Sequence, residues 1–275
     1  MLAAAGLAYA SAPHQSAGVR HPAAGAAGGW PVPAGSFTAP SGLRLAGLPA
    51  ADYSAVLPGL LGFASASAPK GLAEYRLTSD AALYSSRADD PVARLPARNF
   101  LAQPTVVDVV TIRGRWALAL TPARKELPSK AGGNAPAQTA AWLRASLLAH
   151  RRTLSDVVTI SVAAQTLTIR TPLSARVFRV GVGAPGTPTP TGVTGYLQTR
   201  YLDPSQGESL YPIQLTSLHS AAADEPYRGS GGGLIGIHYD AAHSGAISHG
   251  CVRLTAAAIT AVNALPLGTP VVIDR

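Results

Sequence analysis

The sequence predicts a mainly β protein with one helix near its C-terminal end, on the basis of three observations. Its 275 residues include 23 Pro and 28 Gly, which favour turns and short strands over long helices. Apolar and polar residues alternate in short runs, as half-buried strands require. One stretch, Ala256 to Leu265, is rich in helix formers, with Thr255 placed to cap its first turn and Pro266 after its end.

The first 49 residues do not predict a folded unit. Residues 1–12 are apolar and end in small residues, like the apolar part of a signal peptide that lacks its basic start, so we expect export; an ordinary Ala-rich leader is the alternative. Residues 13–49 are mostly Ala, Gly, Pro and Ser, which bury too little surface to offset the entropy of ordering. We therefore expect a flexible tether up to residue 49, then a connecting segment at residues 50–73.

Residues 74–150 predict a small β domain. Their order resembles that of the bacterial SH3-like barrels found ahead of wall enzymes, with Leu95-Pro96 before a loop, Arg113-Gly114-Arg115-Trp116 at a turn and a closing Trp142-Leu143-Arg144. Ala141 stands where that family usually has Gly. The resemblance implies a wall-binding or positioning module, and a mere spacer is equally compatible. The strand-length runs are residues 82–84, 92–95, 105–110, 116–120 and 141–144.

A second β domain is expected over residues 155–275. Apolar residues alternate over 158–162 and again over 167–170, which predicts an antiparallel hairpin with its turn near residues 163–165. Further strands are expected at residues 176–180 and 270–274. The predicted helix lies between these last two strands.

The formal charge of +8 comes from Arg residues scattered along the chain. Without a dense basic run, this charge does not predict nucleic-acid binding. A diffuse positive potential instead favours residence near polyanions such as a bacterial wall, although solubility alone would also explain it. No stretch of about 18 apolar residues predicts a membrane span.

Cys251 is the only cysteine, so the chain cannot form an intrachain disulfide or a Cys-based metal site. A lone thiol is either inert, as buried cysteines usually are, or reactive. Two neighbours favour reactivity. His238 ends an apolar run and could take the thiol proton, and Gly250 permits a sharp turn that brings backbone amides close to a substrate.

These residues resemble the L,D-transpeptidase catalytic domain of YkuD type. That family has a His, a variable loop, Ser/Thr-His-Gly-Cys, one apolar residue and then Arg or Asn. Here His238 is followed by Ser248-His249-Gly250-Cys251-Val252-Arg253. The resemblance covers about residues 157–275 and implies a β-sandwich or barrel-like sheet with one helix after the nucleophile. Four further segments match in order: residues 182–183, 187–192, 215–219 and 270–273.

The resemblance implies that Cys251 is the acyl-accepting nucleophile and that His238 is its general base and later acid. His249 is the alternative base. Ser248, His249 and Gly250 would shape the turn. The amides of residues 249–251 would form the oxyanion hole.

Three residues are candidates for substrate binding, namely Arg253, His219 and Tyr239. Arg253 would hold a substrate carboxylate or, equally, form a structural ion pair. The family commonly has Gly after the base histidine, often followed by Thr or Ser, whereas Tyr239-Asp240 follow His238 here, and the loop to Cys251 is short. A backbone carbonyl or Asp240 could therefore orient His238.

The implied activity is the cross-linking of peptidoglycan stem peptides with release of D-alanine, by an exported monomer in the periplasm or at the wall. Acylation by carbapenems is expected, whereas a cofactor or a metal is not, because the pair His219 and His243 fits no ligand motif. The Gly-rich residues 228–233 lack the Lys-Ser/Thr of a phosphate loop and predict a cleft rim. The alternatives are a non-catalytic peptidoglycan-binding protein, and an L,D-carboxypeptidase or cysteine hydrolase of the wall.

Overall fold

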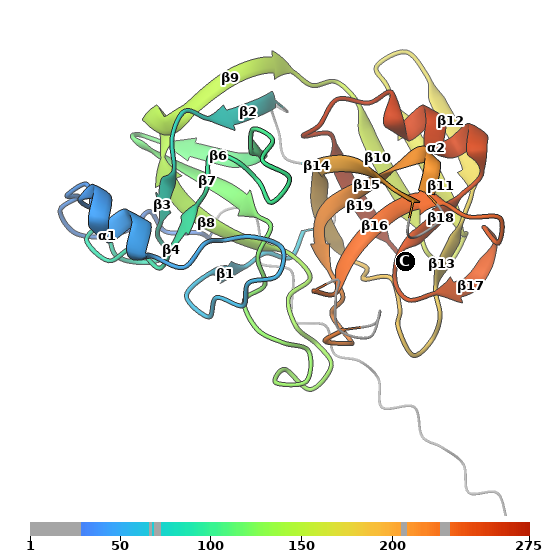
Figure 1. The fold of residues 1–275 in the computed structure, drawn as a ribbon, viewed down its shortest axis with the longest axis horizontal. Helices are drawn as coiled ribbons and strands as arrows, with labels where there is room; N and C mark the ends of the chain where they lie inside the picture. The colour runs from blue at the N-terminus through green and yellow to red at the C-terminus, as the bar shows by residue number, and fades with distance from the viewer. Residues whose placement is uncertain (1–28, 66–67, 69–72, 205–207, 226–231) are drawn as a thin grey trace, which may run out of the picture.

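The computed structural model describes residues 29–65, 68, 73–204, 208–225 and 232–275, and it is mainly β, as the sequence predicts. Two β units lie side by side (Figure 1): the N-terminal unit, built from the described residues between 29 and 153, and the C-terminal sheet of residues 157–274. The signal-like residues 1–12 lie outside the described part. None of the helices described is long and apolar enough to cross a membrane.

The N-terminal unit contains three sheets in the part of the chain that is described. Its strands are β1 (Leu61–Gly62), β2 (Ala73–Leu77), β3 (Ala81–Leu83), β4 (Ala93–Leu95), β5 (Val106–Val107), β6 (Val109–Arg113), β7 (Trp116–Thr121), β8 (Thr139–Arg144) and β9 (Leu148–Thr153). The sheets have the orders β1-β8-β7-β6, β5-β2-β9 and β3-β4. Each predicted strand of this region overlaps an observed one, while β2 and β9 are additional.

Strand β7 is buried on both faces and divides two apolar cores. Ala117 and Ala119 belong to one core, whereas Leu118 and Leu120 belong to the other. Successive side chains of a strand point to opposite faces, so this run supplies both cores at once. That is why the strand reads as a continuous apolar run.

The expectation of a flexible tether does not hold for residues 29–49, which pack on the N-terminal unit. The Trp30 ring stacks on Phe63 with centroids 6.4 Å apart, and Phe37 meets the Trp116 ring edge-on at 5.6 Å. A few large aromatic side chains bury enough surface to order a stretch whose composition is otherwise typical of disorder.

The C-terminal sheet is a single sheet of ten described strands. They are β10 (Val157–Ser161), β11 (Thr166–Arg170), β12 (Ala175–Arg179), β13 (Gly181–Gly183), β14 (Val193–Asp203), β15 (Glu208–His219), β16 (Leu234–Tyr239), β17 (Gly245–Ser248), β18 (Val252–Leu254) and β19 (Pro270–Asp274). Their order is β12-β11-β10-β19-β14-β15-β16-β18-β13-β17. The predicted antiparallel hairpin is β10–β11.

The sheet curls, so that strands from its two ends share one core. Leu167 on β11, Val182 on β13 and Val252 on β18 belong to the same buried cluster, although β11 lies near the other end of the strand order. The side chain of Gln165, in the β10–β11 turn, also accepts the amide of Gly245 on β17 at 3.1 Å. The curled sheet agrees with the predicted sandwich-like fold.

Helix α2 (Ala256–Asn263) is the predicted helix and begins at its predicted cap. The Thr255 hydroxyl accepts the amide of Ala258 at 3.2 Å. The helix packs against β15, β16 and β18 (Figure 1). Arg200 of β14 donates to the Asn263 carbonyl at the helix end, where a cation is favourable. A short helix, α1 (Gly42–Gly47), was not predicted, because it lies in the expected tether.

Tyr196 on β14 joins the two units. Its ring lies in the core that also holds Leu118 and Trp142 of the N-terminal unit, and its hydroxyl donates to the Val106 carbonyl at 3.3 Å. One apolar core therefore extends across the boundary between the N-terminal unit and the C-terminal sheet.

Candidate active site

The parallel strands β16 and β18 place Cys251 and His238 on one face of the sheet. His238 pairs with Arg253. Counting back two residues from this pair, to Gly236 on β16 and to Cys251 directly before β18, sets these two residues opposite each other. Because residues two apart along a strand share a face, Cys251 lies on the face that carries His238.

The thiol of Cys251 lies over Gly236. The Gly236 amide donates to Sγ at 3.2 Å, and the Leu234 carbonyl oxygen is 3.9 Å from the same sulfur. A Cβ at position 236 would lie 3.6 Å from Sγ, an ordinary van der Waals contact, so the sulfur lies directly beside this glycine. An N–H aimed at sulfur favours the thiolate, the form that acts as nucleophile. The residue is 6% exposed.

The turn before Cys251 is closed by Ser248. The Ser248 hydroxyl donates to the Cys251 carbonyl at 2.5 Å and accepts the Gly250 amide at 3.1 Å. Gly250 has a φ of +113°, and a Cβ there would lie 3.1 Å from Cδ1 of Ile235. Both the backbone conformation and the space favour glycine at this position.

Thr189 and Thr187 hold this turn from outside. The Thr189 hydroxyl donates to the Gly250 carbonyl and accepts the Gly183 amide, both at 2.8 Å. The Thr187 hydroxyl donates to the Ser248 carbonyl at 3.1 Å. The segment of residues 187–192, which matched the family resemblance, therefore supports the turn before Cys251.

The structure changes the expected role of the Gly250 amide. We expected it to contribute to an oxyanion hole, but its N–H is engaged by the Ser248 hydroxyl. In this arrangement Gly250 shapes the turn.

His238 is oriented by a backbone carbonyl. Its Nδ1 lies 2.8 Å from the carbonyl oxygen of Tyr239, which can only accept, so Nδ1 carries a proton. In the neutral ring Nε2 is then the nitrogen without a proton. This tautomer can act as a general base.

Asp240, the other partner considered for His238, pairs instead with Arg253. The carboxylate and the guanidinium are 3.2 Å apart, and the second oxygen of Asp240 accepts the Ala242 amide at 2.8 Å. Of the two readings of Arg253, the structure shows the ion pair. The carbonyl of Tyr239 fills the orienting role that the sequence left open.

His219 and Tyr239, the other expected substrate contacts, lie in different surroundings. His219 is 1% exposed, and its Nε2 donates to the Tyr53 carbonyl of the N-terminal unit at 2.9 Å. Burial lowers the pKa of its ring to about 4, so the ring is neutral. The structure therefore gives His219 a contact between the two units instead of a surface open to substrate. Tyr239 is half-buried, with its ring centroid 5.1 Å from that of Tyr211.

The described residues contain no group of three His, Cys, Asp or Glu side chains placed to hold a metal ion. His243 contacts the Asp240 carbonyl through Nδ1 at 3.1 Å. Of the Gly-rich rim expected at residues 228–233, residues 228–231 lie outside the described part. Gly232 and Gly233 form the turn before β16.

Sequence reasoning did not single out two residues that surround Cys251 and its turn, Gly236 and Thr189. A glycine inside an apolar strand often marks a close approach, and this signal would have identified Gly236. Thr189 lies in the matching segment 187–192, but nothing local indicated its role, because its partner Gly250 is 61 positions away along the chain.

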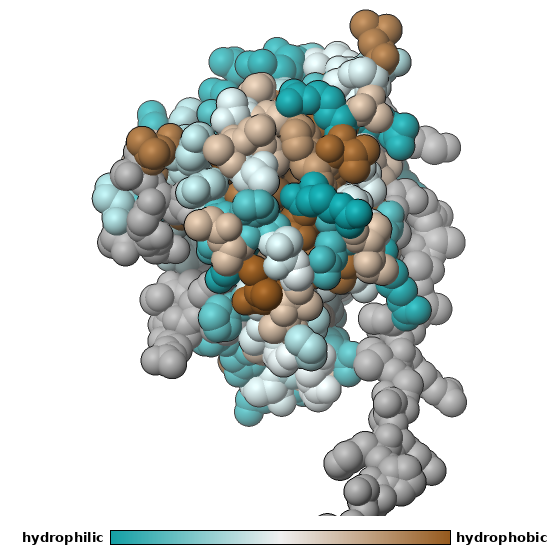
Figure 2. Space-filling model, turned by 90° about the vertical axis from the view of Figure 1, so that its right-hand side faces the viewer, coloured by the Kyte–Doolittle hydropathy of each residue, from teal (hydrophilic) through white to brown (hydrophobic). Residues whose placement is uncertain are grey.

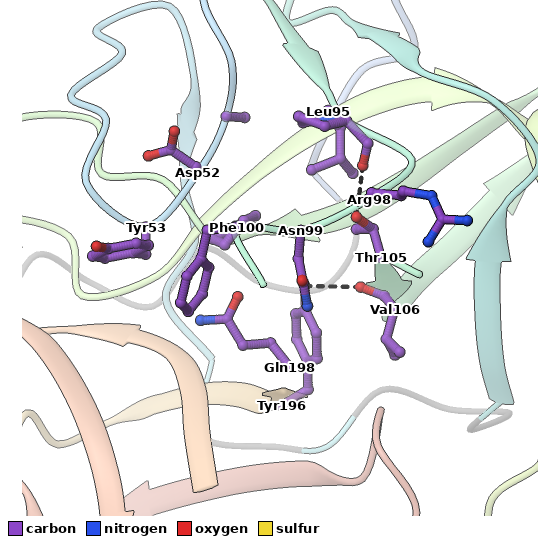
Figure 3. A pocket seen from close by; sticks show the side chains of 13 residues that line it. Asp52, Tyr53, Leu95, Arg98, Asn99, Phe100, Thr105, Val106, Tyr196 and Gln198 are labelled. Atoms are coloured by element: carbon purple, nitrogen blue, oxygen red, sulfur yellow. Dashed lines mark hydrogen bonds between the residues drawn. The ribbon is translucent and has the colours of Figure 1, made fainter. Parts of the chain in front are cut away.

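A pocket with an empty volume of about 590 Å³ lies elsewhere, between the N-terminal unit and β14 (Figure 3). The rings of Tyr53 and Phe100, with centroids 4.5 Å apart, form one part of its lining. Two polar atoms of its lining already have partners, because the Asn99 side-chain oxygen accepts the Leu101 amide at 2.9 Å and the Gln198 side-chain nitrogen donates to the Thr216 carbonyl at 2.7 Å. None of the predicted site residues lines it, so we do not place the chemistry there.

The side of the molecule formed by the C-terminal sheet carries both apolar and polar residues on its surface. Figure 2 shows apolar patches separated by polar residues over this face. The exposed large apolar residues of the sheet include Leu173, Val177 and Ile247. Ile247 is 40% exposed and belongs to β17, the strand that leads into the turn of Cys251.

One comparison with known families finds a match for the C-terminal sheet. Residues 155–273 match the model of the YkuD L,D-transpeptidase catalytic domain. A comparison with curated proteins finds no match.

Several solved structures are similar to this chain. They include an L,D-transpeptidase from Mycobacterium tuberculosis H37Rv (16% identity, 61% of this chain and 96% of that one, TM-score 0.34). Another is an L,D-transpeptidase from Mycobacterium smegmatis (13% identity, covering 63% of this chain and 100% of that one, TM-score 0.33). A third is L,D-transpeptidase 3 from Mycobacterium tuberculosis in complex with a faropenem-derived adduct (15% identity, covering 62% of this chain and 91% of that one, TM-score 0.36).

The family match agrees with the resemblance that the motif around Cys251 predicted. Residues 155–273 are therefore similar to the catalytic domain of YkuD-type L,D-transpeptidases.

Proposed function

We propose that this protein cross-links peptidoglycan stem peptides, with Cys251 as nucleophile and His238 as general base and acid. The observation that carries the proposal is the placement of both residues on one face of adjacent strands, with Nδ1 of His238 held by the Tyr239 carbonyl. The Gly236 amide, 3.2 Å from Sγ, supports the thiolate.

In the first half-reaction, Nε2 of His238 takes the thiol proton and Sγ attacks a donor peptide. The attacked carbonyl belongs to the third residue of the stem, a diamino acid, in the amide that links it to the terminal D-alanine. The C–N bond breaks, His238 returns the proton to the leaving amine, and D-alanine departs. A thioester on Cys251 remains.

In the second half-reaction, the side-chain amine of another stem peptide attacks the thioester. Its proton passes to His238 while the C–S bond breaks, so a new amide joins two third residues and the thiol is restored. The turn that Ser248 and Gly250 shape would present its amides to the developing oxyanion. Transfer to water would instead make the protein an L,D-carboxypeptidase.

The N-terminal unit suits an accessory role in this function. We propose an SH3-like domain at residues 74–150 that positions the catalytic domain on the wall, with the catalytic domain at 155–275. The net charge of +8 favours residence near anionic wall polymers, and we propose that the protein acts after export, in the periplasm or at the wall.

Acylation by a carbapenem would follow from the same chemistry, because a strained β-lactam carbonyl can replace the donor amide. The faropenem-derived adduct on the similar L,D-transpeptidase 3 supports this expectation. Intact-mass measurement of the purified protein with a carbapenem tests the nucleophile alone. Retention of the adduct in Cys251→Ala would show that another residue is acylated.

The decisive experiment incubates the purified protein and its Cys251→Ala variant with disaccharide-tetrapeptides and follows the products by mass spectrometry. The wild type should form a dimer with loss of D-alanine, and the variant should form none. Release of D-alanine without a dimer would indicate the carboxypeptidase. If neither product appears, the catalytic proposal fails and a binding role takes its place.

A further inference from the structure

Arg124 is a buried cation that crosses from the N-terminal unit to the C-terminal sheet. Its side chain is 2% exposed. Its backbone is fixed on its own side, because the Arg124 amide donates to the Ala55 carbonyl at 2.9 Å and the Leu57 amide donates to the Arg124 carbonyl at 2.8 Å. The base of the side chain is therefore rigid.

The guanidinium binds the segment that follows β15. Nη1 donates to the Asp224 carbonyl at 2.8 Å, and Nη2 pairs with the Glu225 carboxylate at 3.0 Å. A Cβ at Gly233 would lie 3.3 Å from Nη1, so the guanidinium lies beside Gly233, just before β16. We refer to Arg124, Asp224, Glu225 and Gly233 as the Arg124 cluster.

The Arg124 cluster lies directly upstream of the contacts made by the thiol. Gly233 accepts the Ser220 amide at 2.7 Å, which joins the end of β15 to the start of β16. The next residue, Leu234, has its carbonyl 3.9 Å from Sγ of Cys251, and the Gly236 amide donates to the same sulfur. Gly233, beside which the Arg124 guanidinium lies, is only three positions before Gly236, whose amide supports the thiolate.

Other bonds from the N-terminal unit hold the same segment, but they are neutral at one or both ends. The Ser129 amide donates to the Asp224 carboxylate at 2.8 Å, and the Ala135 amide donates to the Ala221 carbonyl at 3.1 Å. Arg124 supplies the buried charge. Removing one partner of a buried charged contact costs far more than removing an exposed one, because the remaining groups lose their compensation.

We propose that Arg124 is a positioning residue for the nucleophile: it fixes the start of β16 and thereby aims the Gly236 amide at Cys251. This inference rests on the proposed role of Cys251. It makes the N-terminal unit a part of the catalytic apparatus, acting through β16 without touching the substrate.

The test compares the full-length wild type with Arg124→Gln and with a matched control, Arg94→Gln. Arg94, whose side chain is 22% exposed, also forms an arginine–carboxylate ion pair, with Asp80 at 2.6 Å, but this pair lies within the N-terminal unit. The readout is the rate of alkylation of Cys251 by iodoacetamide as a function of pH, with folding verified by thermal melting.

Arg124→Gln should alkylate about tenfold more slowly at pH 7, with its profile moved to higher pH, which is the effect expected for one hydrogen bond to a charged sulfur. Arg94→Gln should lower the melting temperature and leave the profile unchanged. A wild-type profile in Arg124→Gln, or an equal change in Arg94→Gln, would overturn the inference.

Glu225→Gln removes the partner from the other side and keeps the test open if Arg124→Gln fails to fold. Its profile should move in the same direction, and an unchanged profile would count against the inference. Alkylation needs only a reactive thiol. A protein whose profile depends on Arg124 but which forms no cross-link would therefore refute the proposed function and leave this inference standing.

Discussion

Replacing Thr189 with valine should destabilise the protein and slow the chemistry of Cys251 together. Valine keeps the shape of threonine but lacks its hydroxyl. That hydroxyl donates to the Gly250 carbonyl and accepts the Gly183 amide, each at 2.8 Å, and Thr189 is 2% exposed. Water cannot easily replace either bond at so buried a position.

The expected cost follows from the two groups left behind. A buried donor or acceptor that loses its partner costs about 1–3 kcal/mol, so the loss at Gly183 and Gly250 together should reach about 2–6 kcal/mol. For a protein of this size, each kcal/mol lowers the melting temperature by about 2–4 °C. The Gly250 carbonyl adjoins Cys251, so the turn should also lose its fixed geometry.

The assay combines urea unfolding with the rate of acylation of Cys251 by a carbapenem. Thr189→Ser is the control, because it keeps the hydroxyl and loses only a methyl group, at a cost of about 1 kcal/mol. Thr189→Val should be less stable than Thr189→Ser and acylate more slowly. Equal stability and equal acylation rates in the two variants would show that the hydroxyl does not hold the turn.

Three other variants test separate features. Burial raises the pKa of the Asp108 carboxyl to about 7, so the folded state favours the protonated carboxyl. The stability that this preference gives the wild type is complete below about pH 4 and is lost as the pH rises through 7. In urea unfolding, the free energy of unfolding of Asp108→Asn should therefore exceed that of the wild type by up to about 4 kcal/mol at pH 8 and by nothing at pH 4. The control Asp90→Asn, at an exposed position, should show no such difference between the two pH values. Gly183→Ala should lower the free energy of unfolding by about 3 kcal/mol, because its Cβ would lie 2.3 Å from two backbone atoms. The control is Gly186→Ala, where a Cβ meets open space, and equal melting temperatures of the two variants would contradict this prediction. Gly236→Val should fold but lose most alkylation of Cys251, since its methyl groups would occupy the space of the sulfur; an undiminished rate would show that this space is not needed.

The sequence predicted the elements whose signals are local. The hairpin β10–β11 follows from strict alternation, and helix α2 begins at Thr255 because a hydroxyl there can cap the first turn. The turn before Cys251 could likewise be predicted, since Ser248, Gly250 and Cys251 are close along the chain.

Features that depend on residues far apart along the chain could not be predicted from the sequence. Residues 29–49 have a composition typical of disorder, yet Trp30 and Phe37 find rings to pack on in the N-terminal unit. His219 matched a family position near substrate, and only the fold shows that Tyr53, 166 positions away, buries its ring. Long-range packing decided both outcomes, and no local pattern encodes it.

Tyr196 has a consequence for how the molecule unfolds. Its ring completes a core that belongs mainly to the N-terminal unit, while its strand lies in the middle of the C-terminal sheet. Neither part can melt without exposing this apolar surface to water, so the free energies of the two parts are coupled. Heating should therefore produce one cooperative transition. Cutting the chain between residues 153 and 157 and separating the fragments would expose apolar core surface on each of them.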